Sequence, residues 1–127
     1  MIKRILLALV FILSLSLAAC APTPVTISQL PIFTGATEST NADFQTAMGP
    51  AIDTLKTSGT VDFKIYDLPA GTKFDAVKSF FTTSLKTDGW TDSKNDDKSL
   101  SLTRGSQGVV IFDLNGTGYS IALVTGK

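Results

Sequence analysis

Few side chains in this sequence are equipped for nucleophilic, acid–base or metal chemistry. Cys20 is the only cysteine, and the chain has no histidine. A thiolate is a good nucleophile and metal ligand, whereas histidine is the usual acid–base group near neutral pH and the commonest metal ligand. A lone cysteine has no partner for an intramolecular disulfide. Cys20 is therefore the residue whose reactivity says most about the chemistry of this chain.

The residues before Cys20 have the three-part layout of a secretory signal. Met1–Arg4 carries the positive charge, Ile5–Leu17 is apolar apart from two serines, and the small residues Ala18 and Ala19 follow. The alternatives are a transmembrane helix and an ordinary cleavable signal in which the cysteine is accidental. A spanning helix is disfavoured because it needs roughly 20 apolar residues, and this run is shorter and is followed by prolines.

The segment Leu17-Ala18-Ala19-Cys20 resembles the lipobox of bacterial lipoproteins. The resemblance implies diacylglycerol on the Cys20 sulfur, cleavage before Cys20, and a further fatty acid such as palmitate on the new N-terminus. Two or three acyl chains hold a protein at a membrane, whereas one binds only marginally. The expected location is the exported side of the cell membrane or the outer membrane. In a host with two membranes, Ala21 favours the outer one, because lipoproteins retained at the inner membrane typically have aspartate there.

The signal divides the chain into three parts, which are residues 1–19, a lipidated tether at residues 20–29, and one globular domain at residues 30–127. The domain is long enough to bury one core. Pro22 and Pro24 favour extended backbone, and at about 3.1 Å per residue the tether keeps the domain close to the membrane. The tether shows no apolar period, so we expect it to contribute no core residues and the domain to fold without it as a soluble monomer.

Two helices are predicted in the first two thirds of the domain. The first begins with Asn41 or Asp43 at its N-cap, and Pro50 makes it either a kinked helix or two short pieces. The second begins at the capping-box pattern of residues 72–75 and ends at Gly89. Their apolar positions recur at helical spacing: Phe44, Ala47, Met48, Ala51, Ile52 and Leu55 in the first, and Phe74, Val77, Phe81 and Leu85 in the second.

Alternating apolar residues predict strands elsewhere in the domain. One strand spans residues 61–66, and a weaker one lies near residues 37–40. Short strands fill residues 90–125, and they are separated by turns at residues 95–98, 105–108 and 115–116. Strands joined by short turns are antiparallel neighbours. The predicted fold is α+β, an antiparallel β-meander sheet with one or two helices packed on one face.

Three stretches give the domain a second likeness. They are Pro-Ile-Phe-Thr-Gly-Ala at residues 31–36, Tyr-Asp-Leu-Pro at residues 66–69, and Gly-Trp at residues 89–90 before the terminal meander. With these motifs the domain resembles the small uncharacterised α+β domains found on bacterial lipoproteins. The motifs are structural, so the resemblance implies a fold without an activity, and it transfers no functional residue besides Cys20.

Two stretches invite a metal or phosphate interpretation. The carboxylates of residues 92–97 are spaced as in a calcium loop, but Lys94 occupies the third position and the loop glycine and closing glutamate are absent. Residues 105–108 are as small and polar as a phosphate-binding loop, but such loops open a helix, and this one joins two strands. We interpret both stretches as turns and expect no metal and no cofactor.

Two further groups invite an enzymatic or ligand-binding interpretation. Asp62, Asp67 and Asp75 lie around one corner of the chain and could pair as acid and base. An aromatic ligand site could be formed by Trp90, Tyr66 and Tyr119. A tryptophan just after a helix stop is more typical of the lid of a core. We therefore assign no catalytic residue.

Charge and composition narrow the function further. Basic and acidic residues are equal in number, eleven each, and the lysines are scattered, so the clustered charge that nucleic acid and anionic lipid surfaces require is missing. We expect a non-catalytic binding or interaction module of the cell envelope. It would bind an envelope protein or peptide at an exposed sheet edge or at the corner formed by residues 66–73. The alternative is a small envelope enzyme or enzyme inhibitor that uses Asp, Ser, Thr, Lys or Tyr.

Overall fold

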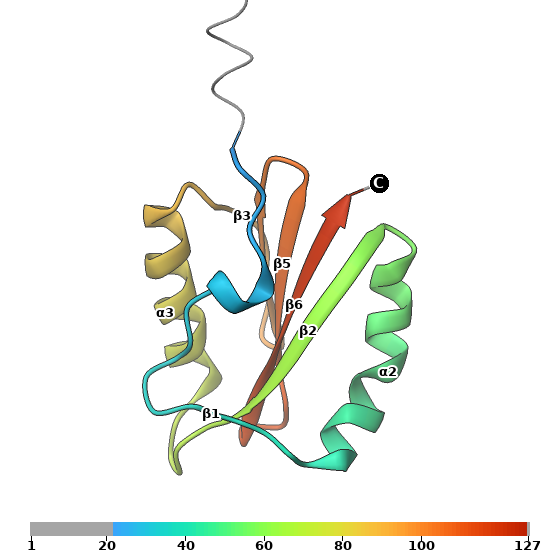
Figure 1. The fold of residues 1–127 in the computed structure, drawn as a ribbon. Helices are drawn as coiled ribbons and strands as arrows, with labels where there is room; N and C mark the ends of the chain where they lie inside the picture. Colours follow the sequence, from blue (N-terminus) through green and yellow to red (C-terminus); the bar gives the residue numbers. More distant parts are fainter. Residues whose placement is uncertain (1–21, 127) are drawn as a thin grey trace, which may run out of the picture.

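Six antiparallel strands form one sheet at the centre of the molecule (Figure 1). The computed structural model describes residues 22–126, so the predicted signal and Cys20 lie outside the described residues. The order across the sheet is β1-β2-β6-β5-β4-β3. The strands are β1 (Thr37–Glu38), β2 (Gly59–Asp67), β3 (Thr91–Asn95), β4 (Ser99–Arg104), β5 (Gln107–Asp113) and β6 (Gly118–Gly126). The α+β class is confirmed.

The last four strands follow one another across the sheet as the predicted meander. Asp96 shapes the β3–β4 turn, because its Oδ1 accepts hydrogen bonds from the backbone N–H groups of Lys98 and Ser99 at 3.0 and 2.8 Å. In the β5–β6 turn, Asn115 and Gly116 have φ angles of 55° and 78°. This left-handed backbone is the one that an Asn-Gly pair tolerates, so local sequence sets both turns.

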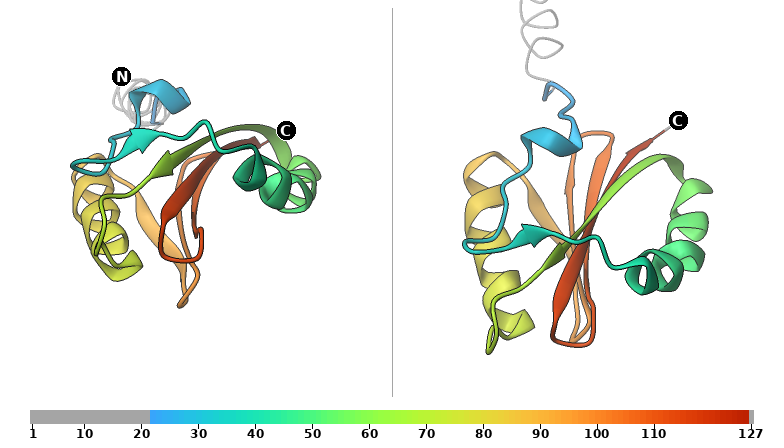
Figure 2. Two further views of the ribbon diagram at one scale, coloured as in Figure 1. Left: turned by 90° about the horizontal axis from the view of Figure 1, so that it is seen from below. Right: turned by 60° about the horizontal axis from the view of Figure 1, so that its bottom comes forward.

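The two helices lie on opposite faces of the sheet (Figure 2). α2 spans Ala42–Lys56 and α3 spans Phe74–Thr87. On β6, Tyr119 and Ile121 belong to the core under α3, whereas Ala122 belongs to the core under α2. Successive residues of a strand point to opposite faces, so one strand serves both cores. α3 is the helix that packs on one face, as predicted, and α2 packs on part of the opposite face instead of beside α3.

α2 is a single helix. Asn41 is its N-cap, as one of the two predicted alternatives, and its Oδ1 accepts a hydrogen bond from the Asp43 N–H at 2.9 Å. The helix continues through Pro50 without a break. Met48 and Ile52 are its buried residues, so the apolar stripe predicted from sequence faces the sheet.

α3 begins differently from the prediction. Lys73 is its N-cap and no side chain caps it, so the predicted capping box at residues 72–75 does not form. Thr72 lies one position before the N-cap, where its hydroxyl cannot serve the first turn, and Asp75 instead lies 3.6 Å from Nζ of Lys78. The end of α3 follows the prediction, because Gly89 has a left-handed φ of 90° just after it.

The N-terminal segment, residues 22–36, packs on the core instead of serving as a plain tether. Val25 and Ile27 are partly buried against the core under α3, and a short 3₁₀ helix, η1 (Ile27–Gln29), follows. Two hydrogen bonds clasp Gln107 to the backbone of Val25. The Val25 N–H donates to Oε1 of Gln107, and the Val25 carbonyl accepts from Nε2 of Gln107, both at 2.8 Å. The expectation that residues 20–29 contribute nothing to the core is therefore wrong for Val25 and Ile27.

Candidate binding edge of the sheet

The sheet has two outer edges that are built differently. β3 is outermost on one side, and on the other side β2 is followed only by the two-residue β1. β1 pairs with Tyr66 and Asp67, and the Ser39 N–H donates to the Ile65 carbonyl at 2.8 Å. Residues 59–64 of β2 therefore have a strand neighbour only on the β6 side. We call the outer side of residues 59–64 the open stretch.

The register of β2 shows which backbone groups point outward along the open stretch. In an antiparallel pair, alternate residues direct both their N–H and their C=O toward the partner strand. The Ile65 carbonyl points away from β6, because it binds Ser39 on the other side. Val61 and Phe63 share its orientation, since the β2–β6 register runs without a shift. Within residues 22–126, no backbone hydrogen bond from outside the β2–β6 ladder reaches these two residues.

Phe63 adds an exposed aromatic ring to these unpaired groups. It keeps 40% of its surface exposed, and within the described chain only Ile32 is a comparably exposed large hydrophobic residue. Its neighbours on the same face, Val61 and Ile65, pack in the core under α2. Ala122 lies opposite Phe63 on β6. Phe63 is therefore the member of an otherwise covered apolar row that stays available at the edge.

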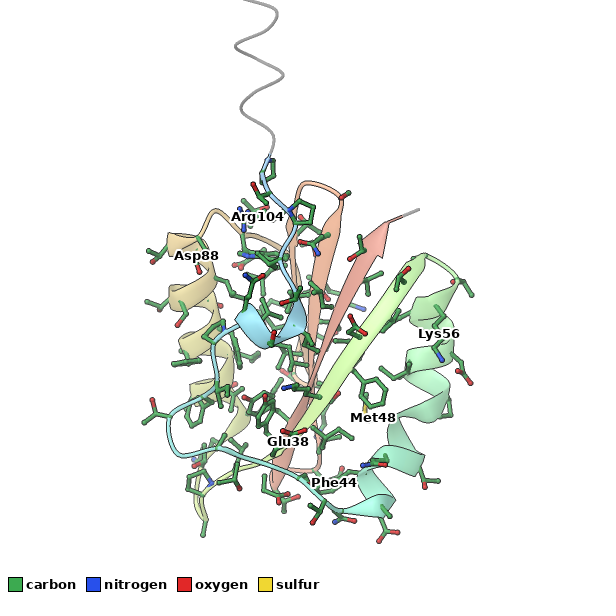
Figure 3. The ribbon with its side chains drawn as sticks, in the orientation of Figure 1. Glu38, Phe44, Met48, Lys56, Asp88 and Arg104 are labelled. Carbon is green, nitrogen blue, oxygen red and sulfur yellow. The ribbon has the colours of Figure 1, made fainter. Side chains whose placement is uncertain are left out.

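α2 lies along one side of β2, and η1 of the N-terminal segment also lies against β2 (Figure 2). Figure 3 shows Met48 on α2 beside β2, with Glu38 on β1 at the end of β2 opposite Lys56 of α2. Glu38 is exposed, and Lys56 is exposed and lies 3.7 Å from Asp53. The open stretch thus lies between an acidic and a basic end.

The β3 edge has the features that natural sheets use to prevent strand addition. All five of its residues are exposed, and its pairing with β4 shifts between Asp92 and Lys94, so Ser93 forms a bulge. Nζ of Lys86 lies 3.6 Å from Asp92, and Nζ of Lys94 lies 3.6 Å from Asp96. A charged and bulged edge is a poor template for a partner strand.

The predicted corner of residues 66–73 does not form a site around Tyr66. Tyr66 is 6% exposed and its ring stacks on that of Tyr119 with centroids 5.1 Å apart. Burial raises the pKa of Tyr66, and the Glu38 carboxylate adds to the rise. Burial also raises the pKa of Tyr119 to about 12, although its hydroxyl accepts the Phe33 N–H. Both phenols are core groups that stay protonated at neutral pH.

The carboxylates singled out from the sequence do not meet. Asp62 and Asp67 are an odd number of positions apart on β2, so they lie on opposite faces of the sheet, and Asp75 lies on α3. The Asp96 carboxylate is occupied by the β3–β4 turn, and the N–H of Lys98 and the groups of Ser99 lower its pKa. Within residues 22–126, no three His, Cys, Asp or Glu side chains are placed to hold a metal ion.

The aromatic candidates lie in one core instead of around an open site. Trp90 is 2% exposed and belongs to the same core as Tyr66 and Tyr119, so the three rings pack among apolar side chains and form no open ligand site. The backbone N–H of Trp90 donates to the carbonyl of Leu85 at 3.0 Å. This bond closes the end of α3 and holds the indole as the lid of the core.

Two hollows on the described surface bear on the search for a site. One of about 430 Å³ lies between α3 and β3 and includes Lys78, whose Nζ donates to the Asn95 side chain and the Asp96 carbonyl at 3.0 and 2.9 Å. These two hydrogen bonds occupy the ammonium group of Lys78. The second, of about 270 Å³, lies between the N-terminal segment and the end of α3.

No protein-family model, no curated protein and no solved structure matches the chain. Among the helices of residues 22–126, none is long and apolar enough to cross a membrane. Sequence reasoning named an exposed sheet edge but could not locate it, because the strand order that leaves β2 open depends on pairing between distant segments.

Proposed function

We propose that this protein is a lipid-anchored binding module of the cell envelope that captures an extended protein segment on the open stretch of β2. The observation that carries the proposal is the set of outward N–H and C=O groups of Val61 and Phe63 beside an exposed aromatic ring. Unpaired edge groups of this kind add a strand from a partner. The lipobox-like sequence at Cys20 supports the anchor.

The local geometry defines what such a segment would look like. One partner residue pairs with Val61 and another, two positions along, pairs with Phe63, because outward groups recur at every second residue. Its side chains then alternate between the α2 flank and the flank of the N-terminal segment. An apolar side chain beside Phe63 would bury ring surface, and charged residues at its ends would complement Glu38 and Lys56. The class of partner is thus a short apolar strand with charged ends.

Photocrosslinking in the native host tests the binding edge. A photoreactive amino acid at exposed Thr60 should capture a discrete protein. Val61→Pro should abolish that capture, because proline removes an outward N–H while leaving the β6 side of the ladder intact. The matched control is Ser93→Pro at the bulge of the β3 edge, which should leave capture unchanged. Equal capture from a crosslinker at position 93, or capture that survives Val61→Pro, would overturn the edge assignment.

The anchor is tested separately. Cys20→Ala should accumulate a heavier precursor that incorporates no labelled fatty acid, since the acyl transfer and the cleavage that depends on it both need the Cys20 sulfur. Ser93→Ala is the matched control and should process normally. Fatty acid label in the Cys20 variant would contradict the lipoprotein assignment without touching the binding edge.

A further inference from the structure

The point at which the chain leaves the domain is held in place by contacts from two elements. A Cβ atom added at Gly105, in the β4–β5 turn, would lie 2.9 Å from Cγ of Pro22. Two residues after Gly105, Gln107 clasps the backbone of Val25, and this glutamine is only 5% exposed. The chain is therefore positioned against the β4–β5 turn before the domain core begins.

Only two residue steps separate Pro22 from Cys20, which is at most about 7 Å of chain. The β4–β5 turn therefore has to stay within a short distance of any lipid attached to Cys20. The ends of α3, α2 and β6 lie at the same end of the molecule (Figure 1). We call this end, marked by residues 104–106, the membrane end. The β5–β6 turn, which contains Asn115 and Gly116, lies at the opposite end, because the β5–β6 register runs from Gln107 and Thr125 to Asp113 and Tyr119.

The smaller hollow opens at the membrane end. Figure 3 shows Asp88, just after α3, and Arg104, at the end of β4, both at this end. None of the ion pairs within residues 22–126 involves either of them. The hollow is lined by Val25, Gln29, Leu30, Pro31, Leu85, Asp88, Trp90 and Arg104. Leu30, Leu85 and Trp90 are almost fully buried, so the surface that the hollow exposes is more polar than apolar. It includes one cation and one anion that have no ion-pair partner in the described chain.

We propose that the membrane end docks on the phospholipid surface and that the Arg104 guanidinium binds a lipid phosphate. A guanidinium matches phosphate oxygens with paired hydrogen bonds. Asp88 would repel an anionic headgroup, but it suits the ammonium of phosphatidylethanolamine. This inference rests on the lipid anchor of the proposed function, since the anchor is what brings the bilayer to this end.

Docking would also restrict the partner of the open stretch. Gly59, the first residue of β2, pairs with Gly126, whose N–H donates to the Ser106 carbonyl at 2.8 Å. β2 therefore starts at the membrane end, and with roughly 3.4 Å per residue its open stretch lies within about 20 Å of the lipid surface. A captured segment would then belong to a protein that lies close to the same membrane.

Depth-dependent fluorescence quenching on the full lipidated protein tests this docking. Ser106→Cys and Asn115→Cys provide single labelling sites at the two ends, because acylation blocks the sulfur of Cys20. The labelled proteins are placed in phosphatidylethanolamine–phosphatidylglycerol vesicles that contain a lipid with a spin-labelled headgroup. Quenching should be several-fold stronger at position 106 than at position 115. Arg104→Gln should at least halve the quenching at position 106, whereas Lys98→Gln at the β3–β4 turn should not change it.

The outcomes separate the two proposals. Protein that floats with the vesicles but is quenched equally at both positions would overturn the docking and leave the anchor intact. Protein that does not float at all would overturn the anchor and the docking with it. Gln107→Leu gives an independent check, because releasing Val25 should reduce the difference between positions 106 and 115 even though the lipid remains attached.

Discussion

The helices that cover the two faces of the sheet differ in helix propensity and in the number of side chains they bury. α3 contains neither proline nor glycine and buries Phe74, Val77, Phe81 and Leu85. α2 carries a glycine and a proline in its interior and buries only Met48 and Ile52. Interior proline removes a helical hydrogen bond, and glycine costs about 1 kcal/mol relative to alanine. The helix on the face next to Phe63 is therefore intrinsically the weaker one.

The buried hydroxyl groups of β6 also differ between the two faces. On the α3 face, Tyr119 is buried and its hydroxyl accepts the Phe33 N–H at 3.2 Å. On the α2 face, Ser120 is fully buried and its Oγ has no hydrogen-bond partner within the described chain. Regions of low local stability are where proteins place movable binding elements. We infer that the α3 face holds the fold while the α2 face leaves the neighbouring edge adaptable.

The largest expected effect is on the α3 face. Phe81→Ala should lower the free energy of unfolding by about 3–5 kcal/mol, because Phe81 is 0% exposed and its ring meets that of Tyr119 at 5.4 Å. Urea denaturation followed by Trp90 fluorescence measures the change. An unchanged transition would mean that α3 is not packed on the sheet.

On the α2 face the same kind of truncation should cost less. Ile52→Ala should lower the free energy of unfolding by about 2 kcal/mol, the low end for such changes, because a weak helix can relax into the space. Leu85→Ala on α3 is the matched variant and should cost more, since Leu85 is 1% exposed within the larger core. Equal losses for the two variants would remove the proposed difference between the faces.

Alkaline pH should lower the free energy of unfolding, because it deprotonates Tyr119 on the α3 face. The pKa of Tyr119 is raised to about 12, so the folded protein holds this proton more tightly than the unfolded chain. The resulting stability is present below pH 10 and is lost as pH rises from about 10 to 12, amounting to at most about 3 kcal/mol. Tyr119→Phe should flatten this part of the pH–stability profile, and a profile identical to that of the parent protein would contradict the assignment to Tyr119.

Removing the unpaired hydroxyl of the α2 face should stabilise the protein. Ser120→Ala should raise the free energy of unfolding by about 1 kcal/mol, because a buried polar group without a partner costs its desolvation. Ser99→Ala is the contrasting variant, since its Oγ donates to Asp96 at 3.1 Å and its loss should destabilise. A loss of stability in Ser120→Ala would indicate that its hydroxyl has a partner after all.

The smallest effect on stability is expected at the binding edge itself. Phe63→Ser should change the free energy of unfolding by less than about 1 kcal/mol, because the ring is 40% exposed. The same variant should sharply reduce capture from the crosslinker at Thr60. Unfolding and crosslinking measured on one variant therefore separate the fold from the function, and a large stability loss would place Phe63 in the core instead.

Local patterns predicted the elements well where a few neighbouring residues decide the outcome. The apolar spacing of α3, the left-handed Gly89 after it, the Asn41 cap and the turn at Asn115-Gly116 are all confirmed. The capping box at residues 72–75 failed because α3 begins one position later than the pattern requires. A shift of one residue costs little when tertiary packing supplies most of the helix stability.

Non-local pairing was beyond the sequence patterns. The clasp between Gln107 and Val25 joins positions 82 residues apart, so the apparent tether gave no local sign of docking. Likewise, residues 59–64 stay open because β6 pairs with β2 and β1 ends after Glu38. Alternation predicted a strand at residues 61–66 but could not say which of its sides would lack a neighbour.

Local sequence accounts for the α+β class, the meander, the apolar stripe of α3 and the expectation of a lipid at Cys20. Those features depend on residues close together in the chain, where spacing and side-chain chemistry act directly. Long-range pairing and packing put the helices on opposite faces, bury Tyr66 and leave Phe63 exposed at an unpaired edge. Strand order and burial depend on which distant segments pair and pack with one another. The local spacing of residues does not specify those pairings.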